Sequence, residues 1–334
     1  MTASALSPNA NDIASATLAR AALVVTPALD EAVRRLSPSL QGPVLHHLAG
    51  GGKRVRAALS LVAAGAAGAT EETGVPGAVA IELVHNFSLI HDDIIDGDTE
   101  RRHRSTVWSE FGVGSAIIVG DALATLALQV LLDEPAPERV LAARCLVEAT
   151  QLMIAGQADD MAFESRASVT VEECLAMENG KTSALLSCAV SLGAILAGAP
   201  DATVAALSEF GSHLGTAFQA VDDLLGVWGE PARTGKPVGS DLCQHKKTLP
   251  VTLALARTDE RAEELRRLLE VDLSPADVER ARVLLEECGA RKETVALADA
   301  HLTMALAALD RVLLVPGPKS ELVAIARFVT ERDS

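Results

Sequence analysis

Three aspartates lie within five positions of one otherwise apolar stretch, at Asp92, Asp93 and Asp96. Asp92 and Asp96 are four residues apart, so a helix would carry both carboxylates on one face, with Asp93 about 100° further round. No lysine or arginine lies between residues 75 and 96 to neutralise them. Crowded carboxylates suit hard cations such as Mg²⁺ or Ca²⁺. A metal site and a solvated acidic face both fit this stretch on its own.

A second acidic pair, Asp222 and Asp223, follows about 130 residues later. On a helix, Gly215, Gln219, Asp222 and Gly226 would share one face. Basic residues follow both acidic segments, at 101–104 after the first and at 236 and 246–247 after the second. The repeated arrangement favours one cation-dependent site over two unrelated surface faces.

Further basic residues cluster in the segment 50–56, where three glycines are followed by three cations. A helix that starts there would favour an anion at its N-terminus, although a solvated helix start fits equally well. Lys181 and Thr182 begin a very apolar stretch, and they fit either an anion site or a plain helix start. A later predicted helix carries candidates whose alternative is an N-cap or a surface acid: Gln157, Asp159 and Asp160.

Composition limits the classes of function. The chain has 334 residues, 49% of them hydrophobic, and a formal net charge of −16. This charge argues against nucleic-acid binding through a broad basic surface, so an anionic substrate must meet local cations or bound metal. The five cysteines are scattered without metal-ligand spacing, and the N-terminus has no signal-peptide pattern, so we expect a reduced, cytoplasmic protein.

Helix-forming residues dominate and period-two strands are not evident, which predicts an all-α fold. The acidic stretch reads as a helix because apolar residues recur at helical spacing, at Val79, Leu83, Phe87, Ile90 and Ile94. Ser274-Pro275 predicts a helix start. The apolar stretches Gly114–Leu132 and Ser183–Ala199 are predicted to be helices buried on all sides, so no integral membrane segment is expected.

Taken in order, these motifs resemble the trans-prenyltransferase (polyprenyl diphosphate synthase) family over most of the chain. The resemblance rests on Gly-Gly-Lys-Arg-Val-Arg at 51–56, the segment 85–96, Arg-Arg at 101–102, Gly-Asp-Ala-Leu at 120–123, Gly-Gln at 156–157, Lys-Thr at 181–182, Phe-Gln-Ala-Val-Asp-Asp at 218–223, Gly-Lys-Pro at 235–237 and Lys-Lys-Thr-Leu-Pro at 246–250. It implies one bundle of mostly antiparallel helices around a central cavity (isoprenoid synthase type). Residues 1–10 would be a flexible N-terminus and 11–334 a single domain, usually in a homodimer.

The resemblance also implies substrates and cofactors. An allylic diphosphate would be held by Mg²⁺, commonly three ions, and isopentenyl diphosphate by direct cations without metal. The implied metal ligands are Asp92, Asp96 and Asp222, with Asp93 and Asp223 in support. The implied allylic diphosphate site is Arg101, Lys181, Thr182, Gln219, Lys236 and Lys246. The implied isopentenyl diphosphate site is Lys53, Arg56, His85 and Arg102.

The implied reaction needs no dedicated protein base, because the released diphosphate can accept the proton. Where the family's second acidic motif usually ends in a third aspartate, this chain has Gly226, and His103 and Ser105 replace a usual glycine and proline. Phe87, five residues before Asp92, implies a C20 product, geranylgeranyl diphosphate, although an ideal helical wheel places Ser88 nearer the acidic face. A farnesyl or longer-chain synthase, a terpene cyclase on the same fold and a non-catalytic partner subunit stay as alternatives.

Overall fold

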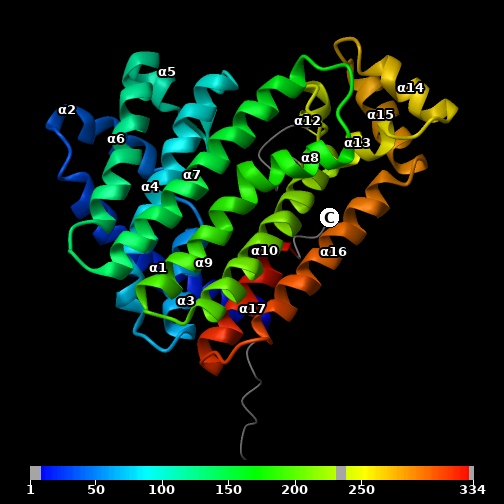
Figure 1. Ribbon diagram of the computed structural model, residues 1–334. Coiled ribbons are helices and arrows are strands. Elements are labelled where there is room, and N and C mark those ends of the chain that lie inside the picture. Colours follow the sequence, from blue (N-terminus) through cyan, green and yellow to red (C-terminus); the bar gives the residue numbers. More distant parts are fainter. Residues whose placement is uncertain (1–8, 231–237, 331–334) are drawn as a thin grey trace, which may run out of the picture. The chain divides into compact units, whose positions relative to one another are not determined.

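The structure is a computed structural model that describes residues 9–230 and 238–330, and it is built almost entirely from helices (Figure 1). The predicted all-α fold is confirmed. In chain order the elements are α1 (Ala10–Val33), α2 (Pro38–Leu48), α3 (Val55–Ala66), η1 (Glu71–Gly74), α4 (Val75–Ile95), β1 (Glu100–Arg101), β2 (Arg104–Ser105), α5 (Val107–Phe111), α6 (Val113–Leu131), α7 (Pro137–Glu164), α8 (Val171–Glu178), η2 (Asn179–Ser183), α9 (Ala184–Leu196), α10 (Asp201–Trp228), α12 (Ser240–Cys243), α13 (Leu249–Leu255), α14 (Glu260–Leu268), α15 (Pro275–Glu287), α16 (Ala290–Leu309) and α17 (Pro316–Thr330).

The contacts divide the chain into two compact units. Of the described residues, unit 1 comprises 9–150, 185–208 and 308–328, and unit 2 comprises 151–184, 209–230, 238–307 and 329–330. That residues 11–334 form a single domain stays a prediction. Residues 1–8 of the predicted flexible N-terminus lie outside the described residues, but α1 already begins at Ala10, where Asn9 caps it by accepting a hydrogen bond from the Asp12 N–H.

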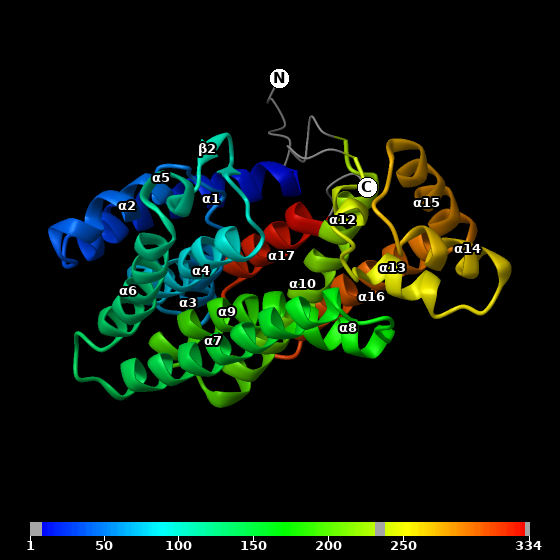
Figure 2. The same ribbon diagram turned by 90° about the horizontal axis from the view of Figure 1, so that it is seen from above.

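In unit 1, α4 lies in the core between its neighbours α3 and α6 (Figure 2). Val79, Leu83 and Ile90 are buried, as the apolar spacing predicts, whereas Ile94 near the helix end is only partly covered. Helix α9 packs so closely on α3 that a Cβ atom at Gly193 would lie 2.0 Å from the Ser60 carbonyl oxygen. The acidic residues of α4 therefore emerge at the end of a rigidly packed helix.

The two apolar stretches differ in burial. Nearly all of α9 is buried, as predicted. The prediction of burial on all sides is wrong for α6, since Ile117 and Ile118 are 44% and 56% exposed. Helix α6 packs on α4 with one face only. Among the described residues, α1 and α6 pass a length and hydropathy test for membrane helices, a test that core helices of soluble proteins also pass, so the absence of an integral membrane segment stays a prediction.

In unit 2, the short helices α12 to α15 gather around a shared apolar core (Figure 1). Leu242, Val251, Leu265 and Leu284 each contribute one buried side chain from a different helix. The predicted helix start at Ser274 is confirmed, because Ser274 and Asp277 form a reciprocal capping box at the N-terminus of α15. This cluster supports the segment 240–250, which carries the predicted site residue Lys246.

All five cysteines are free thiols, consistent with the prediction of a reduced protein. The two nearest sulfurs are those of Cys145 and Cys188, which lie 3.8 Å apart in unit 1. A disulfide bond has a sulfur–sulfur length of about 2.05 Å, so the two thiols are not covalently joined, and Cys145 Sγ donates a hydrogen bond to Cys188 Sγ.

Candidate active site

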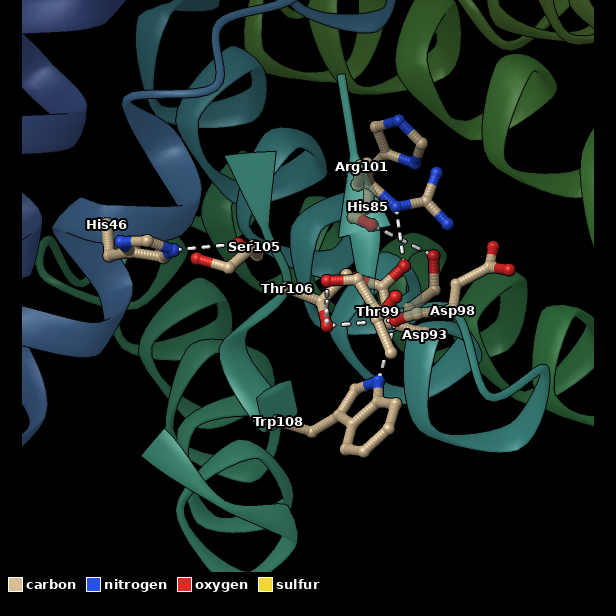
Figure 3. Close-up of polar contacts among 10 residues, drawn as sticks. His46, His85, Asp93, Asp98, Thr99, Arg101, Ser105, Thr106 and Trp108 are labelled. Carbon is tan, nitrogen blue, oxygen red and sulfur yellow. Dashed lines mark hydrogen bonds and ion pairs between the residues drawn. The ribbon is translucent and has the colours of Figure 1, made fainter. Parts of the chain in front are cut away.

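The first acidic segment lies at the C-terminal end of α4 (Figure 3). Asp92 is partly exposed, and Asp96, at the C-cap, is exposed and keeps helical backbone angles (φ −78°, ψ −11°). Asp93 is 1% exposed. Negative charge at a helix C-terminus is disfavoured by the helix dipole, so three carboxylates there call for nearby cations.

Arg101 supplies one of these cations. Its Nε donates to Asp93 Oδ1 at 2.6 Å, and burial raises the pKa of Asp93 while Arg101 opposes that rise. Two hydrogen bonds hold the segment between α4 and β1 in place. Trp108 Nε1 and Thr106 Oγ1 both donate to the Asp98 carbonyl oxygen (Figure 3). Asp93 Oδ2 is buried without a hydrogen-bond partner. The buried aspartate thus anchors Arg101 beside the two open carboxylates.

Arg102 follows in the turn between β1 and β2, with a left-handed backbone (φ 53°). Its guanidinium lies against the glycine-rich segment, because a Cβ at Gly52 would be 2.8 Å from Arg102 Nη1. The adjacent Lys53 places its ammonium 4.8 Å from the centre of the Phe328 ring. Two of the predicted isopentenyl diphosphate residues, Lys53 and Arg102, thus belong to loops that touch each other.

The other two predicted members of this set, Arg56 and His85, also meet. Arg56 Nη1 lies 3.3 Å from His85 Nε2, and the Arg56 Nε atom is buried without a hydrogen-bond partner. Burial, reinforced by Arg56 and Arg102, holds the pKa of His85 well below its ordinary value. This lowered pKa favours the neutral, hydrogen-bonding form of His85, and its role in binding isopentenyl diphosphate stays a prediction.

Arg54, in the same glycine-rich segment, has a structural role. It pairs with buried Glu82 at 3.0 Å, and the other oxygen of Glu82 accepts a hydrogen bond from the Ala57 N–H at the start of α3. We considered a solvated helix start and an anion site for segment 50–56. The purely solvated helix start is wrong, because a buried ion pair between Arg54 and Glu82 covers the N-terminus of α3.

His47 also belongs to this region, although no sequence motif selected it. It lines a small pocket with His46, Arg101 and Arg102. Burial and the two arginines lower the pKa of His47 to about 4. Its position next to two site arginines depends on how α2 packs, which a single sequence does not reveal.

Phe87 and Ser88, the predicted chain-length residues, occupy different surroundings. Phe87 is 8% exposed, and its ring meets the His91 ring edge-on at 5.0 Å. His91 in turn contacts the Ile117 carbonyl oxygen, so Phe87 faces the α6 side of the helix. Ser88 is partly exposed and donates to the His85 carbonyl oxygen.

The second acidic pair lies near the C-terminal end of α10, in unit 2. Asp222 is exposed, whereas Asp223 is 3% exposed. Asp223 accepts from Gln219 Nε2 and from the Leu249 N–H at the start of α13, both at 2.8 Å. Burial and the neighbouring carboxyl group of Glu178 raise the pKa of Asp223 well above its ordinary value.

Lys181 and Thr182 do not begin a helix, and that reading is wrong. They lie in the π-helical turn η2, which joins α8 to α9 without a break. Lys181 donates to Asp160 at 2.5 Å, and Thr182 Oγ1 donates to Gln219 Oε1 at 2.7 Å. Asp160 is inside α7, so the N-cap alternative for it is wrong as well. π-helical turns often occur at functional sites.

A cavity of about 200 Å³ in unit 2 brings the predicted residues of that unit together. It is lined by Asp160, Met177, Glu178, Lys181, Thr182, Gln219, Asp222, Asp223, Asp241, Lys246, Lys247 and Thr248. Sequence reasoning selected Lys246 but missed Asp241, Lys247 and Glu178, although Asp241 lies only five residues before Lys246 in the sequence. Lys236, also predicted, lies outside the described residues.

The donor set fits a hard divalent cation. Asp92 and Asp96 present carboxylates at helical spacing, and Asp222 presents another beside lysines. Within the described residues, histidine, cysteine, aspartate and glutamate side chains form no group of three that could hold a metal alone. Magnesium is usually bound through one or two carboxylates together with substrate phosphates, which suits this sparse arrangement.

Comparison with known proteins identifies the family. The sequence model of the polyprenyl synthetase family matches residues 37–287. A (2E,6E)-farnesyl diphosphate synthase of Mycobacterium tuberculosis is 43% identical over 93% of this chain and 91% of its own length. A geranylgeranyl diphosphate synthase of the same organism is 41% identical over 96% of this chain and 95% of its own.

Solved structures agree. A polyprenyl synthetase from Streptomyces coelicolor A3(2) superposes with a TM-score of 0.91, at 45% identity over 95% of this chain and 99% of that one. A geranylgeranyl pyrophosphate synthase from Corynebacterium glutamicum, complexed with isoprenyl diphosphate and magnesium, gives 0.84, at 28% identity over 97% and 100%. The chain belongs to the polyprenyl synthetase family, and it is a prenyl transferase by class.

Proposed function

We propose that the chain is a Mg²⁺-dependent short-chain prenyl diphosphate synthase, which joins isopentenyl diphosphate to an allylic diphosphate. One observation, present in both units, carries this proposal. An aspartate that is at least partly exposed (Asp92 or Asp222) is followed directly by a buried aspartate. The buried carboxyl group holds a neighbouring group in place, since Asp93 binds Arg101 and Asp223 binds the Leu249 N–H. The magnesium-bound relative supports the choice of metal.

The chemistry starts with heterolysis of the allylic carbon–oxygen bond. Bound Mg²⁺, up to three ions, would neutralise the charge that develops on the departing diphosphate. Asp92, Asp96 and Asp222 would hold the metal, and Arg101, Lys181, Thr182, Gln219, Lys236 and Lys246 would hold the diphosphate. Fixed cations that are already oriented cost no reorganisation when the charge develops, which is why such groups stabilise the transition state effectively.

The second substrate then reacts with the allylic cation. The double bond of isopentenyl diphosphate supplies the electron pair for the new carbon–carbon bond, and a proton leaves the adjacent carbon to the released diphosphate. Lys53, Arg56 and Arg102 would bind the isopentenyl diphosphate group as direct cations. His85, held neutral, would add a hydrogen bond without adding charge.

We propose a C20 product, geranylgeranyl diphosphate, and Phe87 as the residue that ends chain growth. The two relatives differ on product length, one being named a farnesyl and the other a geranylgeranyl diphosphate synthase. The bulk and burial of Phe87 one turn and a half before Asp92 support a floor at this depth, since a helical turn of about 5.4 Å is close to one isoprene unit.

Product analysis tests both proposals. Purified protein is incubated with Mg²⁺, isopentenyl diphosphate and a C5, C10 or C15 primer, and we expect C20 diphosphate with each. No elongated product from any primer would reject the synthase, and a hydrocarbon product would favour a terpene cyclase. Phe87→Ala should lengthen the product. An unchanged length in Phe87→Ala would remove Phe87 as the floor.

We also propose that the protein is a homodimer, cytoplasmic, with a second copy covering an apolar face of unit 1. Helix α6 and the first half of α7 expose Val113, Ile117, Ile118, Val140 and Leu141, each 44% to 57% exposed. Apolar faces of this kind mark subunit interfaces. Light scattering should show that Ile118→Arg is monomeric, while Leu313→Arg, at a 99% exposed residue in the α16–α17 connection, stays dimeric. A dimeric Ile118→Arg would contradict the assignment.

A further inference from the structure

Gly226 in α10 lies directly against the carboxylate of Asp241. A Cβ at position 226 would lie 1.8 Å from Asp241 Oδ2 and 2.4 Å from its carboxyl carbon. Heavy atoms that are not bonded do not approach so closely, so the carboxylate occupies the space in which any side chain at 226 would begin. Gly226 is inside α10, whereas Asp241 comes from the short helix α12.

Position 226 has a counterpart in the other acidic helix. In α4 the residue four positions after Asp92 is Asp96, and the two carboxylates follow one face. In α10 the residue four positions after Asp222 is Gly226, which has no side chain. The carboxylate that reaches this point of the α10 face is therefore that of Asp241, from another element.

The surroundings of Asp241 indicate that its carboxylate binds a ligand and does not only pack against Gly226. Asp241 and Asp222 line the same cavity, together with Lys181 and Lys246. The hydrogen bond that Ser240 Oγ donates to Asp241 Oδ1 is long, at 3.4 Å. Glu178, 3% exposed, also lines the cavity, and its Oε2 is buried without a hydrogen-bond partner. A cavity with carboxylates, lysines and an unpaired buried oxygen fits a divalent cation carrying a diphosphate.

We propose that Asp241 supplies the carboxylate that α10 lacks at position 226, and that glycine at 226 is required to admit it. Asp222 and Asp241 would together hold a divalent cation on a diphosphate bound in unit 2. The inference rests on the proposed function and deepens it, because it assigns the metal ligands of unit 2 to two different elements.

Titration calorimetry of Mn²⁺ in the presence of inorganic pyrophosphate tests the pair directly. Asp241→Asn keeps the shape but removes the charge, and it should raise the apparent Kd for Mn²⁺ about tenfold. Gly226→Ala should have a similar effect, because its methyl group displaces the carboxylate. The double variant should be no weaker than the weaker single variant, since both changes remove one interaction. Asp299→Asn, an exposed acid of unit 2 with the same change in charge, should bind as the wild type does.

A transfer of the carboxylate gives a second test. Asp241→Gly should bind Mn²⁺ with pyrophosphate about tenfold more weakly, and adding Gly226→Asp should restore binding to within about threefold of the wild type. Gly226→Asp alone should lower Tm, because two carboxylates would then compete for one space. Wild-type affinity in Asp241→Asn, additive losses in the double variant, or no recovery on transfer would each overturn the inference. Absence of pyrophosphate-dependent Mn²⁺ binding in the wild type would instead reject the proposed function, and the inference with it.

Discussion

The two acidic helices use the same local pattern but different supports. In α4, buried Asp93 binds the side chain of Arg101 and so fixes a cation next to the open carboxylates. In α10, buried Asp223 binds a backbone N–H at the start of α13 and the amide of Gln219, so it fixes neutral groups. An adjacent pair of aspartates thus places one carboxylate outward and one inward, and the inward one determines what surrounds the site.

Burial raises the pKa of both inward aspartates, but their neighbours act in opposite directions. Arg101 opposes the rise for Asp93, whereas Glu178 adds to the rise for Asp223, whose pKa lies well above its ordinary value. Two carboxyl groups that share a buried space do not both ionise easily. The acidic end of α4 is therefore an anionic centre balanced by arginine, and the second pair is a less charged centre beside lysines.

Charge removal at the open aspartates should give the largest effects. Asp92→Asn should lower kcat about 1,000-fold and Asp222→Asn about 100-fold, in the range seen when one group that stabilises transition-state charge is removed. Asp92 should matter more because lysines line the cavity beside Asp222, at Lys181, Lys246 and Lys247, and they would still neutralise part of the diphosphate charge. Steady-state kinetics with saturating Mg²⁺ measures both, and Asp299→Asn controls for net charge. Equal losses would remove the asymmetry between the two helices.

Substitution of the inward aspartates should change stability rather than charge at the site. Asp93→Asn should lower Tm by about 3 °C, because Arg101 loses an anionic partner while partly buried. Asp223→Asn should lower Tm by less than about 1 °C, since asparagine resembles the protonated carboxyl group and still accepts from Leu249 N–H. Calorimetric scans at pH 7 compare the two variants. A larger loss in Asp223→Asn would mean that Asp223 is held as an anion.

The smallest predicted effect concerns acid stability near the α4 end. His47 has a pKa of about 4 in the folded protein, below its ordinary value of 6.5. Between pH 6.5 and 4 the unfolded chain binds a proton at His47 that the folded chain does not, so stability falls as the pH falls through this window. His47→Asn should make the decline in Tm from pH 6.5 to 4 shallower. His103→Asn, at an exposed loop residue, is the matched variant and should leave the decline unchanged.

Much of the fold, and the spacing of the acidic residues in the site, could be predicted from local sequence. The helical spacing of apolar residues in α4 and the capping pattern at Ser274 each depend on residues a few positions apart. The acidic spacings depend only on helical geometry. Each of these features follows from hydrogen bonds and periodicity within one element, so the sequence alone determined them.

Only the tertiary structure decided which of these groups touch. The one-sided burial of α6, the continuous π-helical turn around Lys181, the neutrality of His85 and the low pKa of His47 all depend on elements distant in sequence. The same holds for Asp241, whose carboxylate fills the place of a side chain at Gly226. Burial and charge pairing come from packing between elements, and no local pattern records that packing. The sequence thus determined where the carboxylates occur, and the packing decided which of them are exposed, which are buried and which change their pKa.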